Sequence, residues 1–377
     1  MRYYRRPWHE DRSDSYSHWG TSVYYLAIDA DGFAHRQVVV YATGVVTAYD
    51  EDHQEDLYGG LTYYQLAQRD LEEFAPFEIS PQEYFAALAD LAPMNRPDWS
   101  GRKAVVARTY DEIAAHYDRL GSPFYGQVGE RLVGLLGLRR GERVLDAGCG
   151  RGACLFPAAA AVGPEGQVHG IDLSPGMVAE TAAEAARRGL SQVAVLKGDV
   201  EWPAFEENSF DAVVSGFVLR MLPEPEHAVR AFHRMLRPGG RLGVSVFVSG
   251  FAERWAVVGE ALEPFLTGAA PVLSAHAGKE AALLQDAGFD AVAVADEPFD
   301  VVMPDLGTWW DYLWLSGYRG TMNRIAARDR DKARRVVTET AERLCEPDGS
   351  VRMRVRVRLM TGVKGEAAGG GGSCRPR

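Results

Sequence analysis

The sequence predicts an α/β fold with a parallel sheet wound on both faces by helices, preceded by a small α+β domain with an antiparallel meander. From Lys103 to Phe247, helical segments alternate with short apolar strands, which is the pattern of a doubly wound parallel sheet. Within this region a glycine-rich turn, Val144–Gly152, joins an apolar strand to an alanine-rich helix. Near the N-terminus, short β-branched segments separated by turns are typical of antiparallel strands.

Residues 1–97 are expected to form the small α+β domain. Its strands are predicted at 22–28, 35–41 and 45–49, with a turn at 29–32. Ser80 and Glu83 have the spacing of a capping box, and Pro81 suits the first helical position, so a helix is predicted from there to about Leu91. Residues 98–103 are predicted to be a linker to the second domain.

The first domain is strongly acidic. Up to Arg96 it holds 7 arginines, no lysine and 16 acidic residues, in a chain whose net charge is −11. This charge argues against general nucleic-acid binding, which needs a basic face. The hairpin from Asp29 to Gly44 weakly resembles a family of small uncharacterised bacterial α+β domains, and the resemblance implies no chemistry. Two interpretations stay open: a packing or solubility appendage, or a module that recruits a substrate, a protein partner or a second copy of the chain.

The second domain is predicted in detail from its periodicity. Strands are predicted at 141–145, 167–171, 193–196, 210–214 and 241–247, and helices at 107–120, 127–136, 153–161, 174–188 and 223–236. Later elements are predicted as helices at 251–266, 279–287, 306–316 and 321–344 and as strands at 291–295 and 351–360. The last strand alternates apolar residues with arginine, so we expect a half-exposed strand at the sheet edge. The glycine-rich tail 365–377 is expected to be disordered.

The glycine turn is expected to bind a nucleotide-like ligand, because Gly148 and Gly150 let the backbone approach it closely. The turn also fits the G-x-G-x-x-A pattern, so a NAD-dependent dehydrogenase stays open as an alternative. Asp146, which ends the first strand, would repel a pyrophosphate and attract a ligand with a positive end. Asp172 ends the second strand and suits ribose hydroxyls, and Asp199 follows the third strand and suits an adenine amine.

Five sequence blocks in order resemble the class I S-adenosylmethionine-dependent methyltransferases. The blocks are VLDAGCGRG (144–152), GIDLSPGMV (170–178), GD (198–199), FDAVVSGFVLRMLP (210–223) and LRPGGRL (236–242). The resemblance is to the subgroup of ubiquinone/menaquinone-type and bacterial natural-product methyltransferases. It implies a Rossmann-like seven-stranded sheet with a helical lid insert, in a catalytic domain at 104–364 whose lid and acceptor region lies at about 250–330.

The resemblance implies S-adenosyl-L-methionine as the cofactor and a set of residues around it. These residues are Tyr110, Tyr117, Asp146, Gly148, Gly150, Asp172, Leu173, Met177, Asp199, Val200, Ser215 and Phe217. It assigns Asp146 and the two glycines to the methionine part, Asp172 to the ribose and Asp199 to the adenine. Ser215 and Phe217 are assigned to the side that faces the methyl group. For the two tyrosines, which lie on a helix expected to cover the cofactor, ordinary core packing stays open.

The sequence does not identify a general base. His116 and Arg220 are candidate catalytic residues, and Arg220 is also a candidate to hold an acidic acceptor, with a surface ion pair as the alternative. Trp310 and Trp314 are candidate acceptor contacts in the lid, with helix core as the alternative. No acidic triad with metal-ligand spacing stands out, so a metal-dependent mechanism is not expected.

The sequence therefore predicts a methyltransferase that acts on a small-molecule acceptor at oxygen, nitrogen or carbon, in bacterial secondary metabolism. Two alternatives keep the fold: cyclisation or decarboxylation with the cofactor bound, and a regulatory or scaffold role through the first domain. The four cysteines form no metal or disulfide pattern, and no apolar run approaches the roughly 18 residues of a membrane span. These features predict a cytoplasmic protein that does not bind membranes.

Overall fold

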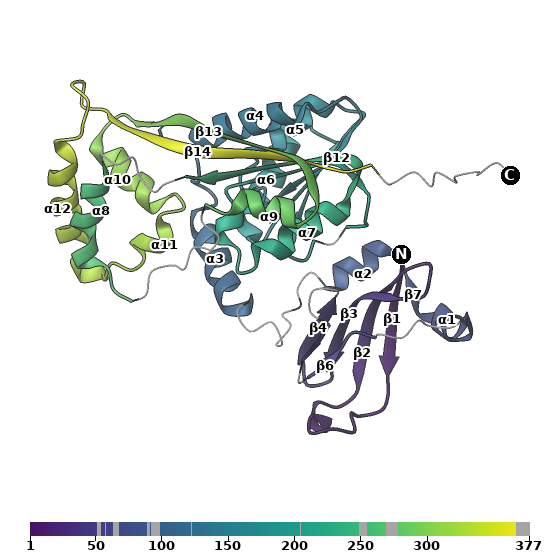
Figure 1. The fold of residues 1–377 in the computed structure, drawn as a ribbon. Helices are drawn as coiled ribbons and strands as arrows, with labels where there is room; N and C mark the ends of the chain where they lie inside the picture. Colours follow the sequence, from purple (N-terminus) through teal and green to yellow (C-terminus); the bar gives the residue numbers. More distant parts are fainter. Residues whose placement is uncertain are drawn as a thin grey trace. The chain divides into compact units, whose positions relative to one another are not determined.

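The computed structural model divides into two compact units, each described here by itself (Figure 1). The N-terminal unit is Met1–Ala104 with Pro203–Glu206, and the C-terminal unit is Val105–Trp202 with Glu207–Arg377. The structure describes residues 1–50, 54–56, 58–62, 68–88, 91, 99–121, 123–203, 205–248, 255–268 and 278–366. The predicted tail 365–377 lies outside these residues beyond Glu366, as does the first turn of the helix predicted at 251–266.

The N-terminal unit is built on an antiparallel sheet of order β4-β3-β2-β1-β7. Its strands are β1 (Arg2–Trp8), β2 (Ser22–Ile28), β3 (Ala34–Tyr41), β4 (Val46–Asp50) and β7 (Glu78–Ile79), and β5 (Glu55–Asp56) pairs with β6 (Gly59–Gly60). The predicted meander is confirmed in β2, β3 and β4. Strand β1 was not predicted, because three arginines interrupt its apolar alternation.

Short helices complete the N-terminal unit. They are η1 (Ser17–Trp19), α1 (Gln68–Phe74), η2 (Ala75–Phe77) and α2 (Pro81–Leu88). The capping box at the start of α2 is confirmed: the Ser80 N–H donates to Glu83 Oε2 at 2.9 Å, and the Glu83 N–H donates to Ser80 Oγ at 3.2 Å.

The C-terminal unit contains a seven-stranded mixed sheet of order β10-β9-β8-β11-β12-β14-β13, which confirms the predicted fold class. The strands are β8 (Arg143–Ala147), β9 (Gln167–Asp172), β10 (Val193–Lys197), β11 (Phe210–Gly216), β12 (Leu236–Phe247), β13 (Phe289–Met303) and β14 (Val351–Lys364). The first five strands pair in parallel, so their carboxyl ends share one edge. Strand β14 runs antiparallel to both of its neighbours.

Helices cover both faces of this sheet. They are α4 (Phe124–Leu136), α5 (Leu155–Val162), α6 (Pro175–Arg187), α7 (Pro225–Met235) and α9 (Glu280–Asp286); α3 (Trp99–Ile113) precedes them in the chain. Figure 1 shows α4 and α5 on one face and α7 and α9 on the other. The linker predicted at 98–103 is instead helical from Trp99, because Gly101 costs a helix interior only about 1 kcal/mol.

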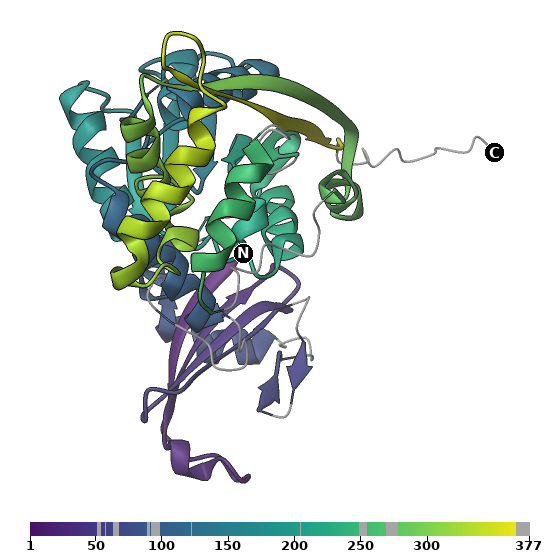
Figure 2. The same ribbon diagram turned by 90° about the vertical axis from the view of Figure 1, so that its left-hand side faces the viewer.

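A group of helices at the far end of β13 and β14 forms the lid (Figures 1 and 2). It contains α8 (Ala256–Leu262), η5 (Glu263–Phe265), α10 (Leu306–Trp314), α11 (Arg319–Met322), η6 (Ala327–Asp329) and α12 (Arg330–Glu342). The single helix predicted at 321–344 is wrong. The chain leaves helical geometry after Asn323 because Ile325 bridges to Leu266 and Arg324 hydrogen-bonds to Thr267.

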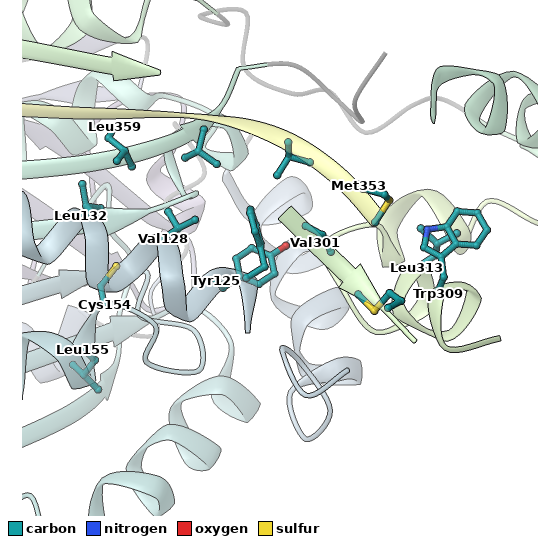
Figure 3. Packing of buried hydrophobic residues seen from close by; sticks show 14 of the residues in the cluster. Tyr125, Val128, Leu132, Cys154, Leu155, Val301, Trp309, Leu313, Met353 and Leu359 are labelled. Atoms are coloured by element: carbon teal, nitrogen blue, oxygen red, sulfur yellow. The ribbon is translucent and has the colours of Figure 1, made fainter. Parts of the chain in front are cut away.

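One hydrophobic core runs from the sheet into the lid. Figure 3 shows Val128 and Leu132 of α4 near Leu359 of β14, and Met353 and Val301 further along toward Trp309 of α10. The lid is therefore held by the same buried apolar surface that holds the sheet. Among the described residues, no helix is long and apolar enough to cross a membrane.

The edge-strand prediction for 351–360 is wrong, because β14 lies between β12 and β13. Its arginines lie on one exposed face and form ion pairs with acids of β13. Arg358 Nε lies 2.8 Å from Asp296 Oδ1, and Arg354 Nε lies 2.9 Å from Asp300 Oδ1. An antiparallel interior strand with one solvated face has the same alternation as an edge strand, so the sequence pattern does not separate the two.

Candidate active site

The glycine turn reverses the chain directly after β8. The N–H groups of Gly148 and Cys149 both donate to the carbonyl of Ile171, at 2.8 and 2.9 Å. Gly148 has φ +80° and Gly150 has φ +47°, a region that residues with a Cβ rarely adopt. These bonds fix the turn against β9 and leave open space beside Gly150.

Asp146 lies buried immediately before this turn, with 1% of its surface exposed. Burial, reinforced by the nearby charge of Asp172, raises the pKa of Asp146 to about 8. Its Oδ2 atom has no hydrogen-bond partner among the described residues. A buried carboxylate oxygen without a donor is costly, and an ammonium group of a ligand would satisfy it. The residues at this position therefore fit the amino acid part of S-adenosylmethionine.

Asp172 ties the glycine turn to the start of α6. Its two carboxylate oxygens accept the N–H of Gly150 at 2.8 Å and the N–H of Ser174 at 2.9 Å. A carboxylate accepts about four hydrogen bonds, so each oxygen keeps capacity for a ligand hydroxyl. Ser174 caps α6 as predicted, since its Oγ accepts from the Met177 N–H at 3.1 Å.

Asp172→Ala is expected to weaken binding of S-adenosylhomocysteine by about 1–3 kcal/mol, roughly 5- to 150-fold, because it removes acceptors for the turn and for the ribose. Isothermal titration calorimetry measures this change. Asp211→Ala is the matched control, because Asp211 also accepts a backbone N–H, that of Arg143 at 2.8 Å, at the opposite end of the strands. Equal affinity in the two variants would remove Asp172 from the site.

The remaining residues that the sequence analysis assigned to the adenosine lie around the same sheet edge. Asp199 follows β10, and its carboxylate accepts the Glu201 N–H at 3.0 Å. Val200 and Met177 are buried, and Leu173 is half-buried. Strand pairing brings the ends of β8, β9 and β10 side by side, because Lys197 pairs with Asp172 and Asp146 pairs with Gly170. Three carboxylates are thus placed along one edge.

The two residues assigned to the methyl side differ in their environment. The Ser215 hydroxyl is fully buried and donates to the carbonyl of Ala147 at 2.9 Å, so it holds β11 to β8. Phe217 has φ +61°, a strained value for a residue with a large side chain, and its N–H donates to Ser245 O at 2.9 Å. The Phe217 ring stacks on Phe247 with centroids 4.4 Å apart.

A group of aromatic side chains, the tyrosine cluster of Tyr110, Tyr117, Tyr125 and Tyr312, lies beside these residues. The Tyr110 and Tyr117 rings are 5.8 Å apart, and the Tyr117 and Tyr125 rings 5.1 Å. Tyr125 also meets Phe217 edge to face at 5.4 Å. Burial raises the pKa of all four phenols, that of Tyr312 to about 12, so they stay protonated at neutral pH.

Hydrogen bonds connect part of the tyrosine cluster. The hydroxyl of Tyr125 shares hydrogen bonds with those of Tyr117 and Tyr312. Three hydroxyls supply three protons and the two bonds use two of them, so one O–H remains to donate to another acceptor. Sequence reasoning missed Tyr125 because it placed the start of α4 at Gln127. Pro123, which precedes the first helical residue, is the signal that would have found it.

Asp118 is a second residue that sequence reasoning missed. The helix predicted at 107–120 ends early, at Ile113, and the chain turns again at Asp118, which has φ +57°. Its carboxylate accepts the N–H groups of Tyr125 and Gly126 at the start of α4, and burial raises its pKa to about 6. Asp118 therefore positions Tyr125 against Tyr117.

The catalytic candidates from the sequence lie elsewhere. His116 is exposed on the turn after α3. Arg220, in η3 (Leu219–Met221), holds a carboxylate of the chain itself: its guanidinium binds buried Glu280 of α9 at 2.7 Å. Its Nε and Nη2 atoms both contact one oxygen of Glu280, so further N–H donors of the guanidinium remain, and a role for Arg220 in holding an acidic acceptor stays a prediction.

The lid tryptophans have different environments. Trp310 is buried in the shared core, whereas Trp314 is half-buried beneath the guanidinium of Arg330, 4.8 Å from its ring centroid. Their centroids are 6.4 Å apart. Core packing therefore accounts for Trp310, and a role for either residue in acceptor binding stays a prediction. No group of three or more metal-ligating side chains occurs in the described part of the chain.

Comparison with known proteins agrees with this geometry. A family model described as a methyltransferase domain matches residues 144–240. Aklanonic acid methyltransferase DauC of Streptomyces sp. (strain C5) is 44% identical over 153 residues, covering 40% of this chain and 70% of that protein. Nocamycin O-methyltransferase of Saccharothrix syringae is 38% identical over 227 residues, covering 56% and 81%. The crystal structure of YcgJ from Bacillus subtilis aligns with a TM-score of 0.45 at 20% identity, covering 64% of this chain and 100% of that one.

Proposed function

The chain belongs to the S-adenosylmethionine-dependent methyltransferases, and from this membership we propose that it methylates an oxygen atom of a planar aromatic acid in bacterial secondary metabolism. The class of acceptor is inferred from the tyrosine cluster together with Phe217 and Phe247. These aromatic rings lie beside the residues assigned to the cofactor. Aromatic side chains favour a flat, apolar acceptor, which stacks on their faces or edges. The names of the two relatives, an acid methyltransferase and an O-methyltransferase, support an acidic oxygen as the acceptor atom.

The cofactor supplies a methyl group already activated by its positively charged sulfur, so the protein needs mainly to position the acceptor and exclude water. A carboxylate oxygen carries its reactive lone pair at neutral pH, so its methylation needs no general base. This supports an acid as the acceptor, because His116 is exposed and Arg220, a permanent cation paired with Glu280, cannot act as a base. The free phenolic proton of the tyrosine cluster would hold the acceptor by donating to its oxygen.

The proposal also covers the residues that hold the cofactor, the cellular compartment of the protein and the kind of acceptor. We assign Asp146, Gly148 and Gly150 to the methionine part and Asp172 and Asp199 to the nucleoside. The adenosine lies against Leu173, Met177 and Val200, with Tyr110 closing over it. Three cysteines of the described chain are free thiols, which supports a reducing compartment such as the cytoplasm. The acidic net charge supports a small molecule rather than nucleic acid as the acceptor.

Incubation with S-adenosylmethionine and a panel of fused-ring aromatic acids, with the matching amides and methyl esters, tests the acceptor class. We expect S-adenosylhomocysteine to form with acids only and mass spectrometry to detect a methyl ester. Turnover of hydroxyl-bearing amides but of no acid would contradict the carboxylate proposal. Binding of NAD and not of S-adenosylmethionine would contradict the choice of cofactor.

Tyr125→Phe is expected to raise KM for the acid about 2- to 10-fold, because one hydroxyl donor is lost, and to leave S-adenosylhomocysteine affinity unchanged. Steady-state kinetics and calorimetry measure the two quantities. Tyr25→Phe is the matched control, because the Tyr25 hydroxyl accepts from Arg5 in the N-terminal unit. An unchanged KM in Tyr125→Phe would remove the cluster from acceptor binding.

A further inference from the structure

The N-terminal unit contains a cavity of about 480 Å³, which the sequence did not suggest. This N-terminal cavity lies between one face of β1, β2 and β3 and the residues of α1 and 60–62, and its lining includes Arg6, Trp8, Leu26, Ile28 and Phe74. Its volume falls in the range of small-molecule sites. The residues that line this cavity lie outside the matched family region, which is 144–240.

The inner part of the N-terminal cavity is apolar. Ile28 is fully buried, and Leu26 and Phe74 are buried beside it in one hydrophobic cluster. Trp8 at the outer end is 42% exposed, a large fraction for an indole. Because the first three side chains are already buried, a ligand with an apolar body would gain contact mainly from Trp8 and from the half-buried Tyr24, which also lines the cavity.

Arg6 is the cation of the N-terminal cavity, and aromatic rings hold it in place. Its guanidinium carbon lies 4.3 Å from the Phe74 ring centroid, 5.5 Å from that of Trp8 and 5.9 Å from that of Phe77. Among the described residues it makes no hydrogen bond or ion pair. Its planar face is therefore covered while its N–H donors remain available.

An unpaired arginine is unexpected in so acidic a domain. Neighbouring arginines do find partners: Arg2 binds Glu78 at 2.6 Å, Arg12 binds Asp14, and Arg5 donates to the Tyr25 hydroxyl at 3.2 Å. Arg6 is excluded from such pairs because its side chain lies in the cavity. A guanidinium beside an apolar surface matches a carboxylate, which accepts two parallel hydrogen bonds from it.

The other polar groups narrow the class of ligand. The Gln37 amide is already engaged, since its Nε2 donates to Gly60 O at 2.8 Å and its Oε1 accepts from Thr62 Oγ1 at 2.7 Å. Glu73 also lines the cavity and is exposed, and its negative charge disfavours a ligand with two or more negative charges. This arrangement favours a carboxylate over a phosphate.

We propose that the N-terminal cavity binds a small apolar carboxylic acid, with its carboxylate on Arg6 and its body against Trp8 and Tyr24. The site is separate in residues from the cofactor residues and does not depend on the proposed acceptor. The bound molecule contains one acidic group and an apolar body of two or three rings or an equivalent chain, which matches the volume.

The proposal is tested by titrating the full-length protein with 2-naphthoate. S-adenosylhomocysteine is kept in excess during the titration. 5-Fluorotryptophan is incorporated, and the Trp8 resonance in the ¹⁹F spectrum is assigned from its loss in Trp8→Phe. We expect 2-naphthoate to shift the Trp8 resonance saturably and 2-naphthamide, the neutral analogue, to shift it at least about tenfold more weakly. Because Trp8 lines the N-terminal cavity, binding elsewhere in the chain does not produce this signal.

Arg6→Gln and Arg5→Gln form the matched pair of variants, since the two residues are adjacent on β1 and only Arg6 lines the cavity. Arg6→Gln is expected to weaken the naphthoate-dependent shift at least about tenfold, and Arg5→Gln to leave it unchanged. Equal weakening in both variants, or no Trp8 shift in the unmutated protein, overturns the proposal. If Arg6→Gln does not fold, the proposal is tested by comparing 2-naphthoate with 2-naphthamide in the unmutated protein. Equal shifts of the Trp8 resonance by the two compounds would then overturn the proposal.

Discussion

Gly148→Ala is expected to abolish detectable binding of S-adenosylmethionine and to lower the stability of the C-terminal unit. A Cβ atom at this position would lie 2.3 Å from Val218 Cγ2, far inside contact distance, and the backbone φ of +80° adds strain for any residue with a side chain. The strain costs about 1–2 kcal/mol and the overpacking about 1–3 kcal/mol more. Relieving the clash moves the turn that Asp172 holds, so we expect affinity for S-adenosylhomocysteine to fall by more than about 100-fold.

Two further glycine variants distinguish the effect of backbone strain on stability from the effect of the residue's position in the turn on ligand affinity. Gly137→Ala has the same kind of strain, with φ +56° and open space around the added atom, but it lies at the end of α4. It should lose stability and keep the ligand affinity. Gly150→Ala, with φ +47° and open space, has the same strain, so it should lose about as much stability as Gly137→Ala. Unlike that variant it should also lose affinity, because the added methyl group occupies the approach of the ligand. Calorimetry and thermal unfolding measure both quantities, and normal affinity in Gly148→Ala would contradict the assignment.

The second large effect concerns the pH dependence of cofactor binding through Asp146. Its pKa of about 8 in the free protein means that the carboxyl group is mostly protonated at pH 6 and largely ionised above pH 8. A cationic ligand binds the ionised form, so affinity is expected to rise by roughly tenfold per pH unit between about pH 6 and 7.5. Binding should release a proton, which calorimetry in buffers of different ionisation enthalpy detects.

Asp146→Asn removes this dependence, and we expect its affinity to be nearly flat over the same range and roughly 10- to 100-fold weaker at pH 7.5. The folded pKa lies above the ordinary value of 3.8, so the folded protein binds the proton more tightly than the unfolded chain. The free energy of unfolding of the ligand-free protein should therefore fall as pH rises from about 4 to about 8, and less steeply in Asp146→Asn. A parallel pH profile in both proteins would exclude Asp146 as the titrating group.

The fold and the placement of the residues assigned to the cofactor could be predicted because they depend on local sequence. Asp146 and Gly148 are two residues apart, and each strand, turn and helix around them has its own periodicity. Strand pairing in a parallel sheet then brings Asp172 and Asp199 to the same edge without further information. The capping box at Ser80 and the N-cap at Ser174 are local in the same sense.

The features that could not be predicted join residues distant in the chain. Arg220 is neutralised by Glu280, 60 residues away, and nothing near Arg220 indicates that partner. Likewise the arginines of β14 pair with Asp296 and Asp300 of β13, so their alternation was mistaken for an edge strand. The tyrosine cluster joins Tyr117 and Tyr125 to Tyr312, and its assembly depends on where the lid packs, which periodicity does not specify.

The long pair of strands β13 and β14 also has an evolutionary consequence. The chain between Met303 and Val351 leaves the sheet and returns to it at paired residues, and it carries Tyr312, Trp314 and the helices α10, α11 and α12. Mutations or insertions confined to this excursion would alter the region that we propose contacts the acceptor, while the ends of β8 and β9 stay fixed. A lineage can thus diversify its choice of acceptor and inherit its cofactor site unaltered.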